Sequence, residues 1–168
     1  AERNRDRIRR LPPPPVPVLV IGNLIVGGAG KTPAAIAIAT ELTRRGHRVG
    51  LLCGGYRAQR TDARLVPPDA DATVEGDEAV LLARETGLPV AAGRERARAL
   101  EVLLAAHPAL DLVISDDGLQ HAALPRSLEV AVFDARGMGN GRLLPAGPLR
   151  EPIERVETLD ALLLNATD

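Results

Sequence analysis

The chain has 168 residues, a formal net charge of −1 and 45% hydrophobic residues, which is the composition of an ordinary globular domain. One cysteine excludes a disulfide framework and a cysteine-based zinc site, while near-neutral charge with one Tyr, one Phe and no Trp argues against a nucleic-acid surface. No apolar run approaches the roughly 20 residues that span a bilayer, and no signal peptide is visible. Lys31 is the single lysine among 21 basic residues, so a general preference for Arg stops at this position.

Residues 1–15 form a distinct segment, with five Arg followed by a run of Pro. The segment lacks the apolar stripe of an amphipathic helix. We therefore expect an exposed arm that leads into one domain over residues 16–168.

Short apolar runs alternate with helical periodicity through the rest of the chain. We expect strands over residues 16–21, 49–53, 88–92, 111–115, 129–133 and 161–164, and helices over 32–45, 77–85 and 94–106. Residues 57–75 are expected to form a loop or small hairpin, and 134–152 a long Gly/Pro-rich connection of the kind that is usually functional. Strands that are apolar on both faces and alternate with helices predict a three-layer α/β domain with a mostly parallel sheet.

A glycine-rich segment, GNLIVGGAGKT, lies between the first strand and the first helix. Its glycines permit backbone N–H groups to converge on phosphate oxygens, and the helix N-terminus adds positive dipole. Lys31 is placed to reach the β- and γ-phosphates, and Thr32 to bind Mg²⁺. The spacing departs from G-x-x-x-x-G-K-[ST] and is typical of the shorter G-G-x-G-K-T form. The alternative is a glycine turn that only joins strand to helix.

Two adjacent acids, Asp116 and Asp117, follow an apolar strand at the edge of the sheet where ligands bind in open α/β folds. Asp116 is a candidate Mg²⁺ ligand. Since adjacent side chains diverge in a strand, the two acids are expected to have different roles. The alternative is a polar strand end that enters the turn at Gly118.

Three further sets of residues also require an interpretation. Asp77 and Glu78 open a helix, where the residues alone favour helix capping and favourable charge in the first turn over a base that orients an acceptor hydroxyl. Gln120 and His121 lie just beyond the acidic pair, although a lone His is more often structural than catalytic. Cys53 is expected to be a small buried residue.

Four segments in order resemble the tetraacyldisaccharide 4'-kinase family: PVPVLVIGNLIVGGAGKTP, EGDEAVLLARETGLPVAAG, SDDGLQH and GNGRLLPAGPLREP. The resemblance covers nearly the whole chain. The phosphate loop is shared with many ATPases, but the last two segments are far more specific. The resemblance implies a P-loop kinase domain that uses ATP and Mg²⁺ to phosphorylate the 4'-hydroxyl of a lipid disaccharide 1-phosphate, at the cytoplasmic face of the bacterial inner membrane.

The resemblance also implies roles for single residues. Asp77 matches the family's proposed catalytic base, which reverses the preference for capping, and Lys31 belongs to the catalytic centre. Glu78 is assigned to the metal region with Thr32 and Asp116. The residues implied in ATP binding are Ile25, Val26, Gly27, Gly28, Ala29, Gly30, Lys31, Thr32, Asp117, Gln120, His121 and Arg150.

The chain departs from the family pattern in three places. Only the Arg-rich segment stands where the family has an amphipathic N-terminal helix. The family's chain is about twice as long, so its C-terminal domain, with a His that partners the catalytic Asp, is expected to be absent here. The family's S-R-G-Y-G loop reads Cys53-Gly54-Gly55-Tyr56-Arg57, which lacks the Arg at Gly54 and leaves Arg57 as a substitute.

Two other functions compete with the kinase. A deviant-loop ATPase switch of the partitioning or metal-chaperone type has a Lys at the first loop position, where this chain has Val26. A nucleotide-binding module without catalysis fits a chain of half the family's length. Nothing in the sequence predicts an oligomeric state.

Overall fold

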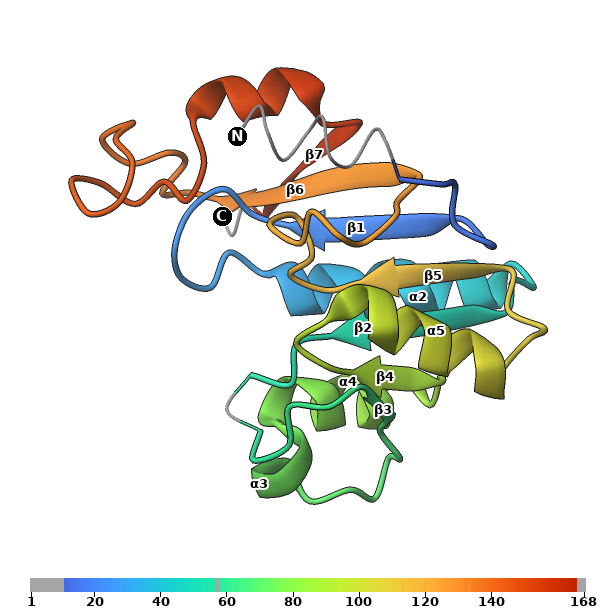
Figure 1. Cartoon of the computed structure of the whole chain (residues 1–168). Helices are drawn as coiled ribbons and strands as arrows, with labels where there is room; N and C mark the ends of the chain where they lie inside the picture. The colour runs from blue at the N-terminus through green and yellow to red at the C-terminus, as the bar shows by residue number, and fades with distance from the viewer. Residues whose placement is uncertain (1–10, 57, 166–168) are drawn as a thin grey trace.

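The computed structural model describes residues 11–56 and 58–165, which form a sheet flanked by helices (Figure 1). Its strands are β1 (Val18–Gly22), β2 (Val49–Cys53), β3 (Arg64–Leu65), β4 (Val90–Ala92), β5 (Leu112–Ser115), β6 (Leu128–Asp134) and β7 (Ala161–Asn165). Its helices are α2 (Lys31–Arg44), α3 (Ala72–Glu75), α4 (Asp77–Thr86), α5 (Arg96–Ala106) and the 3₁₀ helix η1 (Ile153–Thr158).

The strand order is β3-β4-β2-β5-β1-β6-β7, and every neighbouring pair is parallel except β3 with β4. The predicted mostly parallel α/β sheet is therefore confirmed. β1 lies between β5 and β6, and β5 lies between β1 and β2. Because these strands are parallel, the carboxyl ends of β1, β5 and β2 lie at one edge of the sheet. The turn after β1 is the phosphate loop, and the turn after β5 carries Asp116 and Asp117.

Apolar side chains on the two faces of the sheet form two separate cores, which gives the expected three layers (Figure 1). On one face, Leu100 and Leu103 of α5 pack with strand residues that include Leu52 and Val113. On the other face, residues of α2 and α4 pack with strand residues that include Leu51 and Ile114. Adjacent residues of one strand thus enter opposite cores, as a fully buried parallel strand requires.

Several element boundaries differ from the sequence-based expectation. β1 begins at Val18 instead of residue 16, after Pro17, which has no N–H to donate to the sheet. α5 begins at Arg96 instead of residue 94. The interpretation of 57–75 as a loop or hairpin was wrong for α3, a single turn whose N-cap Asp71 accepts a hydrogen bond from the backbone N–H of Thr73.

The described residues near the two ends of the chain are less regular or more exposed than the core. Residues 11–15 belong to no helix or strand, while the rest of the predicted arm lies outside the described residues. The predicted last strand, β7, forms the edge of the sheet, and all five of its residues are exposed. Among the described helices, none combines the length and the apolar character needed to cross a membrane.

Candidate active site

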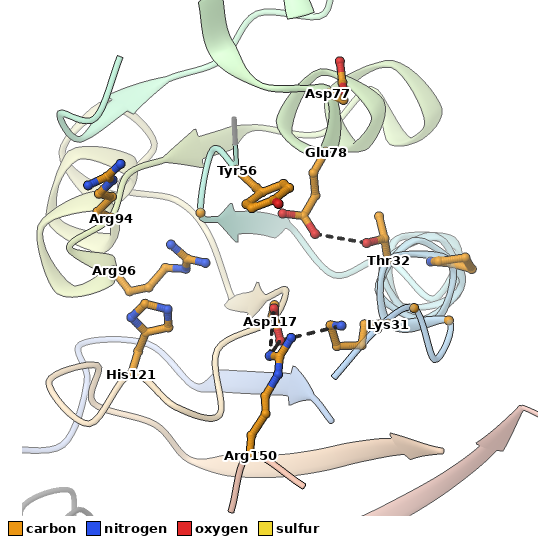
Figure 2. Close-up of a pocket in the computed structure, with 15 residues that line it drawn as sticks. Lys31, Thr32, Tyr56, Asp77, Glu78, Arg94, Arg96, Asp117, His121 and Arg150 are labelled. Atoms are coloured by element: carbon orange, nitrogen blue, oxygen red, sulfur yellow. Dashed lines mark hydrogen bonds and ion pairs between the residues drawn. The ribbon is translucent and has the colours of Figure 1, made fainter. Parts of the chain in front are cut away.

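A cavity of about 1060 Å³ opens at the carboxyl edge of the sheet (Figure 2). Its walls come from the phosphate loop, the start of α2, the turn after β2, the start of α4, the segment entering α5, the turn after β5 and the segment between β6 and η1. The lining residues are Gly27, Gly28, Gly30, Lys31, Thr32, Pro33, Gly54, Tyr56, Asp77, Glu78, Arg94, Arg96, Asp117, His121 and Arg150.

The phosphate loop divides into residues that face the cavity and residues that support the loop. Gly27, Gly28, Gly30, Lys31 and Thr32 line the cavity. The other three predicted nucleotide-binding positions of the loop do not line the cavity. These are Ile25 and Ala29, which are buried, and Val26, whose N–H donates to the Pro148 carbonyl at 2.8 Å.

Thr32 joins two carboxylates that are distant in sequence. Its hydroxyl lies 2.6 Å from Oδ2 of Asp116 and 3.3 Å from Oε1 of Glu78. Asp116 is fully buried, and its second oxygen, Oδ1, has no hydrogen-bond partner. The three residues predicted as metal ligands therefore lie together. This cluster offers two carboxylates and one hydroxyl. In the described part of the chain, no group of three or more His, Cys, Asp or Glu side chains is placed to hold a metal.

Burial raises the pKa of Asp116 to about 7, and the nearby negative charges of Glu78 and Asp117 add to the shift, while the Thr32 hydroxyl opposes it. The carboxyl group is thus poorly solvated and surrounded by like charge. Such an environment favours either a proton or a cation at this position.

Asp117 turns away from Asp116 into a second cluster, as expected for adjacent acids. Its backbone is left-handed, with φ at 49°, a conformation that Asp tolerates better than most residues. Its carboxylate lies 3.8 Å from Nζ of Lys31 and 3.2 Å from Nη1 of Arg150 (Figure 2). Two cations from the two ends of the domain therefore meet on one carboxylate beside the phosphate loop.

Gln120 lies behind this cluster and does not line the cavity. Its side chain accepts from Arg150 at 3.4 Å, and donates to the Asn23 carbonyl at 3.2 Å and to Glu151 at 2.8 Å. Gln120 thus ties the turn after β5 to the phosphate loop and to the segment that carries Arg150.

His121 lines the cavity near Arg96 (Figure 2). Burial lowers the pKa of His121 to about 4, and the positive charge of Arg96 adds to the shift. The imidazole is therefore neutral at pH 7, so it adds no charge to a wall that already carries guanidinium groups.

Asp77 is the first residue of α4, and its exposed side chain belongs to the cavity lining. The N-cap of α4 is Gly76, and no side chain makes a capping hydrogen bond there. Asp77 therefore makes no capping hydrogen bond, but together with Glu78 it places the expected negative charge in the first turn of α4. Glu78, the next residue, points toward Thr32, whereas Asp77 lies farther from the loop (Figure 2).

Five residues that line the cavity were not predicted from the sequence: Pro33, Gly54, Tyr56, Arg94 and Arg96. Arg96 is buried, and its Nη1 donates to the Gly93 carbonyl at 2.6 Å. Burial lowers the pKa of Arg96. A signal for it was present, because Arg96 precedes apolar residues at the i+3, i+4 and i+7 positions of the buried α5 stripe.

Gly54, the position that lacks the family's Arg, lies against this same guanidinium. A Cβ added at Gly54 would stand 2.8 Å from Nη2 of Arg96. The glycine therefore leaves space that Arg96 fills, so a guanidinium still lies beside this turn. Arg57, the substitute considered from the sequence, lies outside the described residues.

The parallel sheet, the glycine loop that enters α2 at Lys31, and the acids at the end of β5 define a P-loop nucleoside-triphosphate-binding fold. The same fold occurs in the 54 kDa signal recognition particle protein from Aeropyrum pernix in complex with GDP, with a TM-score of 0.57 at 19% identity over 98% of this chain and 41% of that one.

The chain belongs to the family whose model is described as tetraacyldisaccharide-1-P 4'-kinase, which matches residues 2–168. It is 52% identical to a tetraacyldisaccharide 4'-kinase of Dechloromonas aromatica over 90% of this chain and 45% of that protein, and 54% identical to one of Acidovorax sp. over 86% and 43%. The structure of LpxK from Aquifex aeolicus in complex with ATP is similar with a TM-score of 0.86 at 32% identity, over 97% of this chain and 53% of that one. The chain thus spans about half the length of the relatives that it matches.

Proposed function

We propose that this chain is the nucleotide-binding part of a kinase that transfers the γ-phosphoryl group of ATP to the 4'-hydroxyl of a tetraacyldisaccharide 1-phosphate. The observation that carries the proposal is the convergence of Lys31, Thr32 and Arg150 on one side of a single cavity, with buried Asp116 bonded to Thr32 behind it and Asp77 on another side. Family membership and the ATP held by the similar Aquifex protein support the choice of nucleotide and acceptor.

The phosphate loop and two cations bind the triphosphate. Gly27, Gly28 and Gly30 leave the backbone open to the cavity, and Lys31 stands at the N-terminus of α2, where the helix dipole also favours an anion. Lys31 and Arg150 exchange part of their pairing with Asp117 for phosphate oxygens. Positioning and charge stabilisation supply most of the rate in such a transfer.

The Thr32, Asp116 and Glu78 cluster fits a magnesium ion. Its donors are oxygens, as Mg²⁺ prefers, and the unpartnered buried Oδ1 of Asp116 is an acceptor without a donor. Two carboxylates at most leave the remaining positions for water and phosphate oxygens. A bound Mg²⁺ would neutralise charge on the β- and γ-phosphates.

Asp77 accepts the proton of the acceptor hydroxyl. A bond forms between the 4'-oxygen and the γ-phosphorus, the bond from that phosphorus to the β–γ bridging oxygen breaks, and the hydroxyl proton passes to the Asp77 carboxylate. The exposed position of Asp77 at the cavity suits a base that meets an acceptor arriving from outside. Arg94 and Arg96, on the wall away from the loop, offer positive charge to an anionic acceptor.

The acceptor places the protein at a membrane surface. A tetraacylated disaccharide resides in a lipid layer, and the reaction consumes cytoplasmic ATP. We therefore propose that the complete protein acts peripherally at the cytoplasmic face of the bacterial inner membrane.

A phosphoryl-transfer assay tests the proposal. Because the chain spans half the relatives' length, residues 1–165 are joined to the C-terminal half of the Dechloromonas aromatica relative and supplied with γ-labelled ATP, Mg²⁺ and tetraacyldisaccharide 1-phosphate. We expect label on the 4'-oxygen, and none above background in the Asp77→Asn variant. A folded, ATP-binding protein that labels no lipid would instead support a nucleotide-binding module.

A further inference from the structure

The outer side of the phosphate loop, away from the cavity, is held by three side chains, one from the start of the loop itself and two from separate segments. One follows β1, one follows β6 and one ends β7. Three successive carbonyls of the loop each accept one of them: Gly27 from Asn23 Nδ2 at 3.2 Å, Gly28 from Arg136 Nη2 at 2.9 Å, and Ala29 from Asn165 Nδ2 at 3.5 Å. None of the three donors lines the cavity.

These contacts determine where the loop's N–H groups point. In a trans peptide unit the C=O and the following N–H point in opposite directions. A carbonyl held on the outer side therefore turns the next N–H toward the cavity. The three contacts together direct the N–H groups of Gly28, Ala29 and Gly30, which is the arrangement that receives an anion.

Arg136 is the best-built of the three donors. Its guanidinium pairs with Asp134 through Nε at 3.0 Å and Nη2 at 2.6 Å, and the same Nη2 donates to Gly28. Asp134 is the last residue of β6, so a carboxylate fixed at the end of a strand orients the guanidinium. The ion pair is exposed, and its role is therefore geometric more than a source of stability.

The loop glycines allow these donors to approach. A Cβ at Gly27 would lie 3.1 Å from Nη1 of Arg136, and one at Gly30 would lie 2.4 Å from Nδ2 of Asn165. Both glycines also have positive φ, at 98° and 88°. The loop is thus closely fitted to Arg136 and Asn165 on its outer side.

We propose that Arg136, oriented by Asp134, is a positioning residue that holds the phosphate loop in its anion-receiving conformation. The proposal rests on the proposed function for its ligand, the triphosphate of ATP. Arg136 acts through the backbone of Gly28 and touches no substrate. Loss of its side chain frees the Gly28 carbonyl and lets the following N–H rotate away from the phosphates.

Binding of ATP and of adenosine to the Arg136→Ala and Asp134→Asn variants tests this role. Since a hydrogen bond from a charged donor is lost, we expect ATP to bind about tenfold more weakly to Arg136→Ala, with a smaller loss in Asp134→Asn. Adenosine affinity, which involves no phosphate, is expected to stay unchanged, whereas a general loss of structure would weaken both ligands. Nitrogen-15 relaxation is expected to show lower order parameters at Gly28 and Ala29 in the nucleotide-free variants.

Arg48 and Asp111 provide a matched control, because they form another exposed, multiply bonded Arg–Asp pair on a distant loop. The Arg48→Ala variant is expected to change neither ATP affinity nor the loop's order parameters. Equal ATP affinity and equal order parameters in Arg136→Ala and the unmodified chain overturn the positioning role while the proposed function stands. If the unmodified chain binds no ATP, the proposed function fails, and the order parameters alone decide the role of Arg136.

Discussion

The two walls of the cavity are organised differently. On the loop wall, Lys31, Arg150 and Thr32 already contact Asp117 or Asp116. On the facing wall, the side chains of Asp77 and Arg94 make no hydrogen bond or ion pair with another described residue. The loop wall is therefore arranged in advance for a small, highly charged ligand, while the facing wall keeps groups available for a second molecule.

The largest expected effect comes from the facing wall. In the full-length fusion, Asp77→Asn is expected to lower kcat about a thousandfold, because a positioned general base contributes roughly 10²–10⁴-fold. ATP affinity should stay within about twofold, since Asp77 lies apart from the phosphate loop. Glu78→Gln is the comparison variant, because it changes the neighbouring acid that points toward Thr32 and belongs to the proposed Mg²⁺ site. A large loss of kcat in Glu78→Gln with full activity in Asp77→Asn would transfer the role of base to Glu78.

The next effect comes from the loop wall. Lys31→Met is expected to weaken ATP binding about tenfold to a hundredfold, because a charged donor to the phosphates is lost. Lys31→Arg retains the charge but introduces a broad planar guanidinium that crowds the backbone cradle. We therefore expect it to bind ATP poorly as well in a calorimetric titration. Full affinity in Lys31→Arg would show that charge alone explains the single lysine.

Sequence patterns predicted the loop wall much better than the facing wall. The order of apolar runs was enough for the sheet, since strands buried on both faces have few other interpretations. Lys31, Thr32 and Asp116 follow strand ends, so a parallel sheet brings them together wherever the strands begin. Tyr56 and Arg94 also follow strand ends, those of β2 and β4, but they belong to no phosphate-binding or metal-binding pattern, so nothing in the sequence singled them out.

Short elements escaped for a related reason. α3 is one turn, and η1 is a 3₁₀ helix of six residues. Neither is long enough to show the repeated apolar stripe by which a helix is recognised in a sequence. β7 was predicted correctly as a strand, but its apolar residues suggested burial, whereas Leu164 is 74% exposed at the edge of the sheet. Apolar composition indicates the strand and not what covers it.

A smaller effect comes from the turn after β2, where the Arg96 guanidinium occupies the space that a side chain at Gly54 would need. Gly54→Ala is expected to lower the free energy of unfolding by about 1 kcal/mol, because its Cβ would crowd a buried guanidinium that is fixed by the Gly93 carbonyl. In the Arg96→Ala background the same change is expected to cost much less. Urea titration of the four proteins measures this coupling. Equal costs in both backgrounds would contradict the shared space.

A further effect is a pH dependence on the facing wall. The folded pKa of His121, about 4, lies below its ordinary value, so the unfolded chain binds more protons between pH 4 and pH 6.5. The free energy of unfolding contributed by His121 is thus present above pH 6.5 and lost as pH falls toward 4. We expect a shallower pH slope for His121→Gln over this range in urea titrations. An unchanged slope would contradict the buried, neutral imidazole.

Calorimetric titration of this chain with Mg²⁺ and either ATP or adenosine measures whether the loop wall is a prearranged triphosphate site. We predict one ATP per chain, bound much more tightly than adenosine, with most of that difference lost in Lys31→Met. Equal affinity for ATP and adenosine, or an ATP preference that survives Lys31→Met, would show that the loop wall is not the triphosphate site.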